Sequence, residues 1–300
     1  MRAAGCSSTP TCTRTDALGS GTARAVGVLV VTLALLTALG VGAFLYLRNR
    51  GGTEPIPGQE RCVATANDQS VAVDLDQAHY ASIIVGLSVR RGLPPRAASI
   101  AMATVYQETG IRNLTYGDRD SVGLFQQRPS QGWGSVRQLS DPYYATGKFY
   151  DALVKIDDWE SGDINDVAQQ VQRSGYPEAY RDHESDARVL ASTLTGHSPA
   201  GFRCLDRSNT PGDPEGLASS LRKTFGKVSP QTVDAKVVVD ARTTRLAWAY
   251  AHYAVANAKY YGVTTVRIGD QTWQTGEFNL PEWTAATPSA KAKRVEITLR

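Results

Sequence analysis

The sequence predicts a mainly α-helical domain that follows one transmembrane helix and precedes a small α+β domain. Three observations support this prediction. Residues 25–47 are apolar and uncharged, residues 74–195 repeat apolar side chains at a helical period, and short β-rich runs follow residue 205. Apolar residues three and four positions apart are typical of amphipathic helices, whereas runs of β-branched residues between turn signals are typical of strands.

The stretch 25–47 is long enough to cross a bilayer. At 1.5 Å per residue it reaches about 34 Å, and a hydrocarbon core is about 30 Å thick. A cleaved signal peptide is the alternative, although its apolar core is usually about 7–15 residues long. Arg24 precedes the stretch, and Arg48 and Arg50 follow it. The positive-inside rule therefore does not fix its orientation.

Cys62 and Cys204 bracket the central region of the chain. A disulfide between them needs an oxidising compartment, and the chain-entropy model gives it about 4–5 kcal/mol of stabilisation. Two buried free thiols are the alternative. With the disulfide, we expect a single-pass protein of the cell membrane whose N-terminus is cytoplasmic and whose remaining chain lies outside the cytoplasm.

Composition divides the chain into six predicted parts. Polar residues at the start are typical of a disordered tail, and Gly/Pro-rich stretches are typical of linkers. The parts are a cytoplasmic tail (1–24), a transmembrane helix (25–47), a linker (48–61), the helical domain (62–204), a second linker (205–232) and an α+β accessory domain (233–300).

Charge and motifs exclude several classes of protein. A net charge of +3 does not give the broad basic field of a nucleic-acid-binding protein, so we expect no nucleic-acid partner. The chain has no HExxH, GxSxG or P-loop motif and no zinc-type cysteine spacing, which argues against metalloproteases, serine hydrolases and P-loop NTPases. We expect neither a metal ion nor a cofactor.

Helix-start signals and apolar period predict the elements in order. Proline just inside a helix start and aspartate just before it favour N-termini. The stretch 110–134 has no period and reads as a long ordered loop of the kind that carries function. We expect helices at 74–91, 94–108, 142–156, 164–173, 177–195 and 243–261, and strands at 235–239, 263–268 and 294–299.

Glu108 is the first candidate catalytic residue. It ends a helix whose preceding residues, SIAMATVYQ, are largely apolar, and Gly110 stops that helix. A carboxyl group between a core and a loop is partly buried, and burial raises the pKa of a carboxylic acid. A general acid needs such a pKa to hold its proton near neutral pH.

The surroundings of Glu108 resemble the signature of the lysozyme-like superfamily, which includes lytic transglycosylases and goose-type lysozymes. Glu108-Thr109-Gly110 is followed, with Gly123 15 positions after the Glu, by Gly123-Leu124-Phe125-Gln126. Pro129 and the run Gly117-Asp118-Arg119 fit the same pattern. The family usually has Ser where this chain has Thr109 and Met where it has Phe125. The resemblance covers roughly residues 75–195.

The resemblance implies a lysozyme-like fold and cleavage of the bond between N-acetylmuramic acid and N-acetylglucosamine. It makes Glu108 the general acid, and it implies that Gly123, Phe125 and Gln126 line the sugar groove. A tyrosine late in the domain supports the catalytic Glu in this family. Tyr176 and Tyr180 both fit that description, and we favour Tyr176.

The second carboxylate is the main departure from the family. Goose-type enzymes are thought to position water with Asp residues, and only Asp118 and Asp120 are available here. If either lies about 6.5–9.5 Å from Glu108, hydrolysis with inversion is feasible. If neither does, the 6-hydroxyl of the sugar can attack instead, which is the lytic transglycosylase reaction. Loop structure is the alternative role for both residues.

The sequence thus predicts a peptidoglycan-cleaving enzyme, a lytic transglycosylase or muramidase that acts at the outer face of the membrane. An inactive lysozyme-like protein that binds peptidoglycan or serves as a cell-envelope scaffold is the main alternative, and a solute-transport accessory protein is a weaker one. The aromatic, basic C-terminal part resembles modules appended to secreted actinobacterial cell-wall proteins. No residue roles follow from that second resemblance.

Overall fold

The computed structural model describes residues 58–175 and 178–300, beginning with a three-stranded antiparallel sheet. Strands β1 (Arg61–Ala66) and β2 (Gln69–Val73) form a hairpin, and β3 (Phe202–Leu205) pairs with the other edge of β1. The turn residues Asn67 and Asp68 have φ values of 47° and 62°. Positive φ at both central residues is typical of the two-residue turns that match the twist of a hairpin, and Asn and Asp tolerate it.

The predicted disulfide is confirmed. Cys62 lies directly opposite Cys204 in the antiparallel pair β1 and β3, and their sulfur atoms are bonded. Both cysteines are buried in the core. The bond joins neighbouring strands and closes a segment whose ends are 142 positions apart in the sequence.

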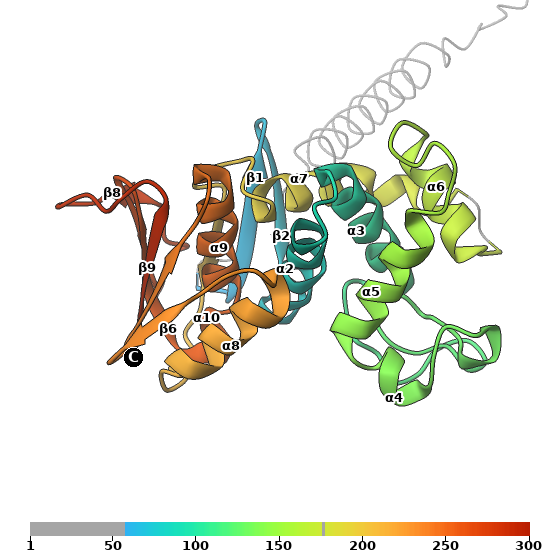
Figure 1. The fold of residues 1–300 in the computed structure, drawn as a ribbon, viewed down its shortest axis with the longest axis horizontal. Helices are drawn as coiled ribbons and strands as arrows, with labels where there is room; N and C mark the ends of the chain where they lie inside the picture. The colour runs from blue at the N-terminus through green and yellow to red at the C-terminus, as the bar shows by residue number, and fades with distance from the viewer. Residues whose placement is uncertain (1–57, 176–177) are drawn as a thin grey trace, which may run out of the picture. The chain divides into compact units, whose positions relative to one another are not determined.

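The chain between β2 and β3 forms a layer of helices (Figure 1). These are α2 (Leu75–Arg90), α3 (Pro95–Thr109), α4 (Val136–Leu139), α5 (Pro142–Leu153), α6 (Ile164–Gln172) and α7 (Glu184–Leu194), with 3₁₀ turns at Pro129–Gln131 and Arg181–His183. Asp74, Asp141 and Asp163 accept hydrogen bonds from backbone N–H groups of the first turns, as N-caps do. Helix α3 is central, because it packs against α2, α6 and α7 and every residue from 97 to 105 is buried.

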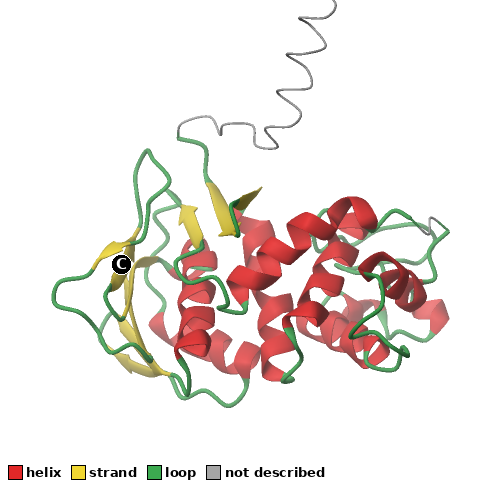
Figure 2. Ribbon diagram, turned by 90° about the horizontal axis from the view of Figure 1, so that it is seen from above, coloured by secondary structure: helices red, strands yellow, loops and turns green. Residues whose placement is uncertain are grey.

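The chain after β3 forms a six-stranded antiparallel sheet with the strand order β4-β5-β9-β6-β7-β8, at one end of the view in Figure 2. The elements of this part of the chain are α8 (Pro214–Phe225), β4 (Gln231–Val233), β5 (Lys236–Asp240), α9 (Thr244–Ala256), α10 (Ala258–Tyr261), β6 (Val263–Ile268), β7 (Gln271–Gln274), β8 (Thr284–Ala285) and β9 (Arg294–Leu299). Helix α9 packs on β6 and β9 and also on α2 and α7. The sheet and the helical layer therefore share one core.

Residues 205–232, which composition indicates as a linker, contain helix α8. Asp213 accepts a hydrogen bond from the backbone N–H of Gly216 at 2.8 Å, and Pro214 occupies the first turn. Leu217 and Leu221 are fully buried, and α8 packs against α2. The Gly/Pro-rich run is a helix start rather than a flexible tether.

The predicted fold class, mainly α-helical with a transmembrane helix, is wrong. The described residues form nine strands in two sheets as well as nine α-helices. The strands are short, at two to six residues, and a short strand gives few alternations by which its sequence can be recognised. The hairpin formed by β1 and β2 was therefore absent from the prediction.

The predicted location, a single-pass membrane protein with a cytoplasmic N-terminus, is also corrected. Across residues 58–175 and 178–300, no helix is both long enough and apolar enough to cross a membrane. The predicted tail (1–24), the predicted span (25–47) and most of the linker at 48–61 lie outside the described residues. Arg61, the last residue of that linker, begins β1.

Candidate functional site

The candidate site lies at the C-terminal end of α3, where Glu108 is partly buried. The helix ends because Gly110 adopts the left-handed conformation, with φ 60° and ψ 38°, and its N–H bonds back to the carbonyls of Tyr106 and Val105. A glycine in this conformation is a common helix C-cap. Its position leaves Glu108 in the last turn of a helix that is otherwise part of the core.

Two neutral donors bind the same oxygen of Glu108. The hydroxyl of Tyr180 donates to Oε1 at 2.8 Å, and Nε2 of Gln172 donates to Oε1 at 3.1 Å. Burial raises the pKa of Glu108 above its ordinary value of 4.5, and these two hydrogen bonds act in the opposite direction. The net effect is a carboxyl group that keeps its proton to a higher pH than an exposed glutamate does.

Tyr180 is fully buried and is the described tyrosine that contacts Glu108. Burial, followed by the charge of Glu108, raises the pKa of its phenol, so the hydroxyl remains a hydrogen-bond donor at neutral pH. The sequence favoured Tyr176 for this role. Tyr176 lies outside the described residues.

Thr109 and Gln172 fix the segment 123–126 against the end of α3. Thr109 Oγ1 lies 3.0 Å from the carbonyl of Leu124 and 3.1 Å from that of Val105, and Gln172 Nε2 donates to the carbonyl of Phe125 at 2.8 Å. The hydroxyl that this chain keeps at position 109 thus joins the helix to the loop. Gln172 contacts both the loop and Glu108.

The predicted groove residues have different structural roles. Gly123 has φ 80°, and a Cβ there would lie 2.3 Å from the carbonyl oxygen of Leu139, so a larger residue does not fit. Phe125 is fully buried and stacks on Phe149 with ring centroids 4.6 Å apart; its side chain belongs to the core. Gln126 is partly buried and donates through Nε2 to the carbonyls of Tyr116 and Gly123, each at 3.2 Å.

Asp120 is held by its own loop. Its Oδ1 accepts from Arg128 Nε at 2.8 Å and from Ser130 Oγ at 3.0 Å, and its Oδ2 accepts from the Ser130 backbone N–H at 2.7 Å. The Arg128 hydrogen bond, with those from Ser130, holds the pKa of Asp120 well below its usual range. Asp118 is exposed beside Arg119, at 3.8 Å. The structure thus gives Asp120 a structural role in the loop.

A cavity of about 650 Å³ adjoins Gln172. Gln172 lines this cavity, and its Nε2 also donates a hydrogen bond to Glu108. Trp133 also lines the cavity and packs partly against the core, so part of its ring is available to a ligand. The lining residues are Gln131, Trp133, Ala152, Lys155, Ile156, Gln170, Val171, Gln172 and Arg173.

Gln172 is the site residue that sequence reasoning missed. It ends α6, where a polar residue at a helix end carries no signal of its own. Three other polar groups near Glu108 belong to the same constellation, namely Tyr180, Thr109 and the carbonyl of Phe125. Within the described residues no group of three or more His, Cys, Asp or Glu side chains is placed to hold a metal ion.

No protein-family model matches the sequence, and no curated protein matches it either.

Proposed function

We propose that this protein cleaves the glycan strand of peptidoglycan, with Glu108 as the acid that protonates the glycosidic oxygen. The observation that carries the proposal is the environment of Glu108, a partly buried carboxyl group with two neutral donors on one oxygen and no cation hydrogen-bonded to it in the described part of the chain. Burial with neutral partners is how a carboxylic acid is kept protonated for general acid catalysis.

The state of Asp120 favours the lytic transglycosylase reaction over hydrolysis. Inverting hydrolysis needs a second carboxylate that accepts a proton from water. Asp120 is a weak base, because Arg128 and Ser130 occupy both of its oxygens. In a transglycosylase one carboxyl group suffices. Glu108 gives its proton to the leaving oxygen as the glycosidic bond breaks, then accepts the proton of the 6-hydroxyl as that oxygen attacks the anomeric carbon.

Tyr180 and Gln172 have a definite role in that sequence of steps. Once Glu108 has given up its proton, its carboxylate is charged and partly buried, which is unfavourable unless donors compensate. The two hydrogen bonds to Oε1 supply that compensation. They strengthen as charge develops, which is the condition for a contribution to the rate.

The cavity beside Gln172 is proposed to hold the sugar units next to the bond that is cleaved, because Gln172 lines the cavity and hydrogen-bonds to Glu108, which is not itself a lining residue. Trp133 offers an aromatic surface of the kind that packs on the face of a sugar ring, and glutamine side chains offer hydrogen bonds to hydroxyl and N-acetyl groups. A volume of about 650 Å³ lies within the usual range for small-ligand sites, about 300–1,000 Å³.

The test is digestion of purified peptidoglycan by the full-length protein, followed by mass spectrometry of the released muropeptides. We expect products with anhydro-muramic ends, and Glu108→Gln should reduce their release by about 10²–10⁴-fold. Glu160→Gln is the matched control, because Glu160 is exposed and loses the same charge. Unchanged release by Glu108→Gln would overturn the assignment, and reducing ends would indicate hydrolysis instead.

A binding protein without turnover is the second candidate. The Asp120–Arg128 pair favours it to the extent that glycan cleavage depends on a second carboxylate. Sedimentation of the protein with insoluble peptidoglycan, together with no released muropeptide from either the wild type or Glu108→Gln, would support this function in place of the first.

A further inference from the structure

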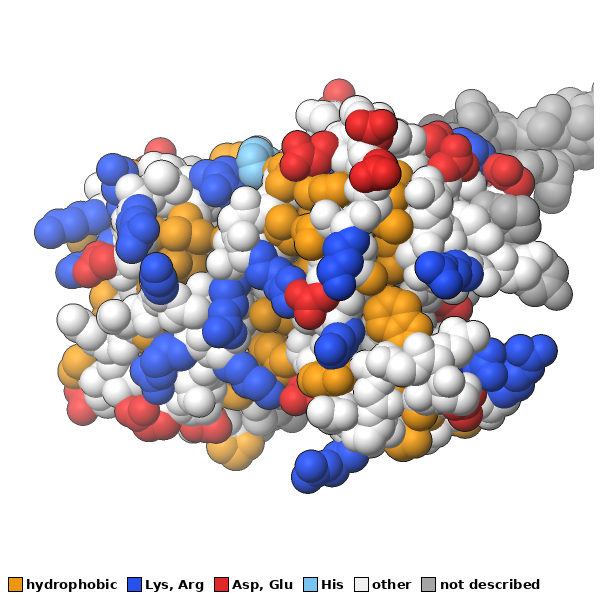
Figure 3. All heavy atoms as spheres, turned by 45° about the vertical axis from the view of Figure 1, so that its right-hand side comes forward, with side chains coloured by type: hydrophobic (Ala, Val, Ile, Leu, Met, Phe, Trp, Pro, Cys, Tyr) orange, Lys and Arg blue, Asp and Glu red, His pale blue; other side chains and the backbone are white. Residues whose placement is uncertain are grey.

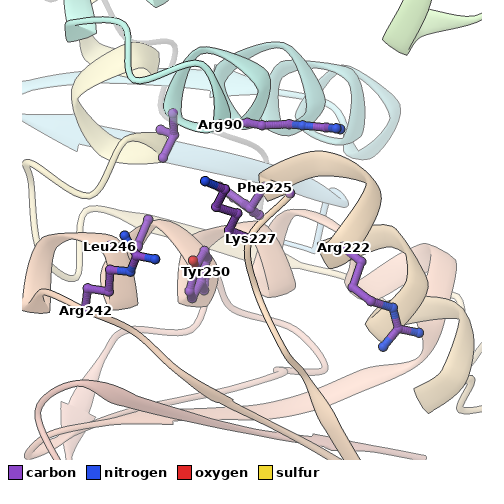
Figure 4. Close-up of a pocket in the computed structure, with 9 residues that line it drawn as sticks. Arg90, Arg222, Phe225, Lys227, Arg242, Leu246 and Tyr250 are labelled. Atoms are coloured by element: carbon purple, nitrogen blue, oxygen red, sulfur yellow. The ribbon is translucent and has the colours of Figure 1, made fainter.

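The cations of a second cavity, of about 560 Å³ among α2, α8 and α9, do not converge on one point. Arg222 points away from Arg242 and Lys227 (Figure 4). Arg90 extends to the opposite side, and all four side chains are exposed. Basic side chains are likewise spread over the face in Figure 3, with uncharged atoms between them. Polar groups do converge at the start of α6, around Asn165.

Asn165 is a fully buried asparagine in the first turn of α6. Its Oδ1 accepts a hydrogen bond from the backbone N–H of Arg181 at 3.1 Å, and its Nδ2 donates to Asp166 Oδ1 at 3.2 Å. Its own backbone N–H donates to Oδ1 of Asp163, the N-cap of the helix, at 3.0 Å. A buried amide is costly unless hydrogen bonds compensate for its lost hydration. These bonds therefore fix the orientation of the Asn165 side chain.

The N–H that Asn165 binds belongs to the peptide unit between Tyr180 and Arg181. The carbonyl of the same unit, that of Tyr180, accepts from the backbone N–H of His183 at 3.2 Å. The N–H also reaches the carbonyl of Glu178, at the longer distance of 3.3 Å. Because a peptide unit is planar, bonds at both of its ends fix the backbone from which the side chain of Tyr180 extends.

The side chain of Arg181 makes a second, more exposed attachment. Its Nη1 donates to Asp163 Oδ2 at 3.1 Å, and its Nε donates to Glu178 Oε2 at 3.2 Å. This side chain is 49% exposed, and exposed ion pairs contribute little to stability. The buried amide of Asn165, rather than these ion pairs, is therefore expected to hold the peptide unit.

Tyr180 transmits the effect to Glu108. Its ring is fully buried, and its hydroxyl donates to Glu108 Oε1 at 2.8 Å. The side chain of Ser174 also hydrogen-bonds to the phenol, so it holds the tip of the ring, whereas Asn165 holds the backbone at its base. A hydrogen bond weakens steeply once its geometry departs from the ideal. A displaced backbone at Tyr180 therefore weakens the donation to Glu108.

We propose that Asn165 is a positioning residue of the candidate site, which acts on Glu108 through Tyr180. Helix α6 then supports Glu108 from both of its ends, through Asn165 at its start and directly through Gln172 at its end. For turnover, this inference rests on the function proposed for Glu108. Its effect on the Glu108 carboxyl group needs no substrate and can be measured by itself.

The test is a pH titration of the full-length protein labelled with ¹³C at the glutamate carboxyl groups, followed by NMR. The signal that is missing in Glu108→Gln identifies Glu108. Asn165→Ala removes the acceptor, and Asn165→Leu removes it while nearly retaining the volume of the side chain. Asn257→Ala is the matched control, because Asn257 is also a fully buried asparagine but bonds to His79, Ser82 and Tyr253.

We expect the titration midpoint of Glu108 to move to higher pH in both Asn165 variants. The donor from Tyr180 lowers the pKa of Glu108, so a weaker donor raises that pKa. The shift should not exceed that of Tyr180→Phe, and Asn165→Ala should add nothing in the Tyr180→Phe background, because both changes act on one hydrogen bond. Asn257→Ala should leave the midpoint unmoved. In muropeptide release, Asn165→Ala should lower kcat about three- to tenfold.

An unmoved midpoint in folded Asn165 variants would overturn the proposal, as would an equal shift in Asn257→Ala. Shifts of Asn165→Ala and Tyr180→Phe that add in the double variant would also overturn it, since Asn165 would then act by another route. Circular dichroism verifies the fold of each variant. A wild-type protein without turnover would overturn the proposed function alone, because the titration is carried out without substrate.

Discussion

Two carboxyl groups, that of Glu108 at the end of α3 and that of Asp120 in the loop of residues 117–130, have opposite environments. Burial raises the pKa of Glu108, and the two neutral donors on one of its oxygens offset only part of that rise. Asp120 is paired with a guanidinium and bonded by Ser130, which leaves its pKa lowered. The surroundings, which are burial for Glu108 and a guanidinium partner for Asp120, decide which of the two carboxyl groups can act as an acid.

Tyr180→Phe should have the largest effect of the substitutions around Glu108, and it tests whether the hydroxyl of Tyr180 sets the pKa of Glu108. Loss of the hydroxyl removes a donor from the carboxylate that forms during the reaction, and we expect the turnover rate to fall about ten- to hundredfold. The same donor lowers the pKa of Glu108. Without it that pKa rises, so the alkaline limb of the pH–rate profile, where the acid form is lost, should move to higher pH.

Measurement of kcat between pH 4 and pH 9 checks both effects. Tyr143→Phe is the matched control, since the hydroxyl of Tyr143 contacts Thr224 and not Glu108. A reduced rate with an unmoved alkaline limb would mean that Tyr180 supports the fold and does not set the pKa of Glu108.

Gln172→Ala should have the next largest effect. It removes one donor to Glu108 and the bond that holds the carbonyl of Phe125, and we expect a loss of about three- to tenfold in kcat. Because Gln172 also lines the cavity, KM should rise as well. Gln170→Ala is the control, since Gln170 lines the same cavity without contacting Glu108. Equal losses in the two variants would assign Gln172 to substrate binding alone.

Asp120→Asn tests the other half of the comparison and should change little. The side chain keeps its shape, and we expect kcat within about threefold of the wild type and an unmoved pH profile. Muropeptide release measured across the same pH range decides the point. A variant that is folded by circular dichroism but inactive would make Asp120 the second carboxylate, and hydrolysis would then replace the transglycosylase reaction.

The smallest expected effect is a gain in stability in Glu108→Gln. A carboxyl group whose pKa is higher in the folded than in the unfolded state stabilises the fold while protonated, and this contribution is lost as pH rises from about 4.5 through the folded pKa. The neutral amide avoids that loss, so we expect about 1 kcal/mol of added stability at pH 8. Thermal unfolding at pH 4 and pH 8 measures it, and a gain as large at pH 4 would contradict the explanation.

Local sequence signals predicted several individual elements correctly, although the predicted fold class is wrong. The predicted strands at 263–268 and 294–299 coincide with β6 and β9, and the helix expected at 94–108 is α3 within a residue at either end. The hairpin of β1 and β2 was not predicted, because strands of five or six residues carry little periodicity, although its Asn67-Asp68 pair is a turn signal. Helix α8 was not predicted, because its Asp-Pro start lies in a Gly/Pro-rich run that is typical of a linker.

Residues of the candidate site that belong to a local sequence motif could be predicted, whereas those defined by contacts between distant parts of the chain could not. Glu108 follows from the end of an apolar helix and from its spacing to Gly123. Gln172 is 64 positions from Glu108, and nothing in its own neighbourhood predicts that contact. The bond between Arg128 and Asp120 depends on the path of a loop without periodicity, so the sequence left Asp120 as a candidate catalyst.

The bond between Cys62 and Cys204 makes the helical layer part of a covalent ring. Every residue from α2 to α7 lies between these cysteines in the sequence, and the chain enters and leaves the ring on adjacent strands. A single peptide-bond cleavage inside the ring, for example in the exposed part of the loop at 115–119, opens it without releasing a fragment. The nicked protein keeps both pieces joined, and they separate once the disulfide is reduced and the chain unfolds.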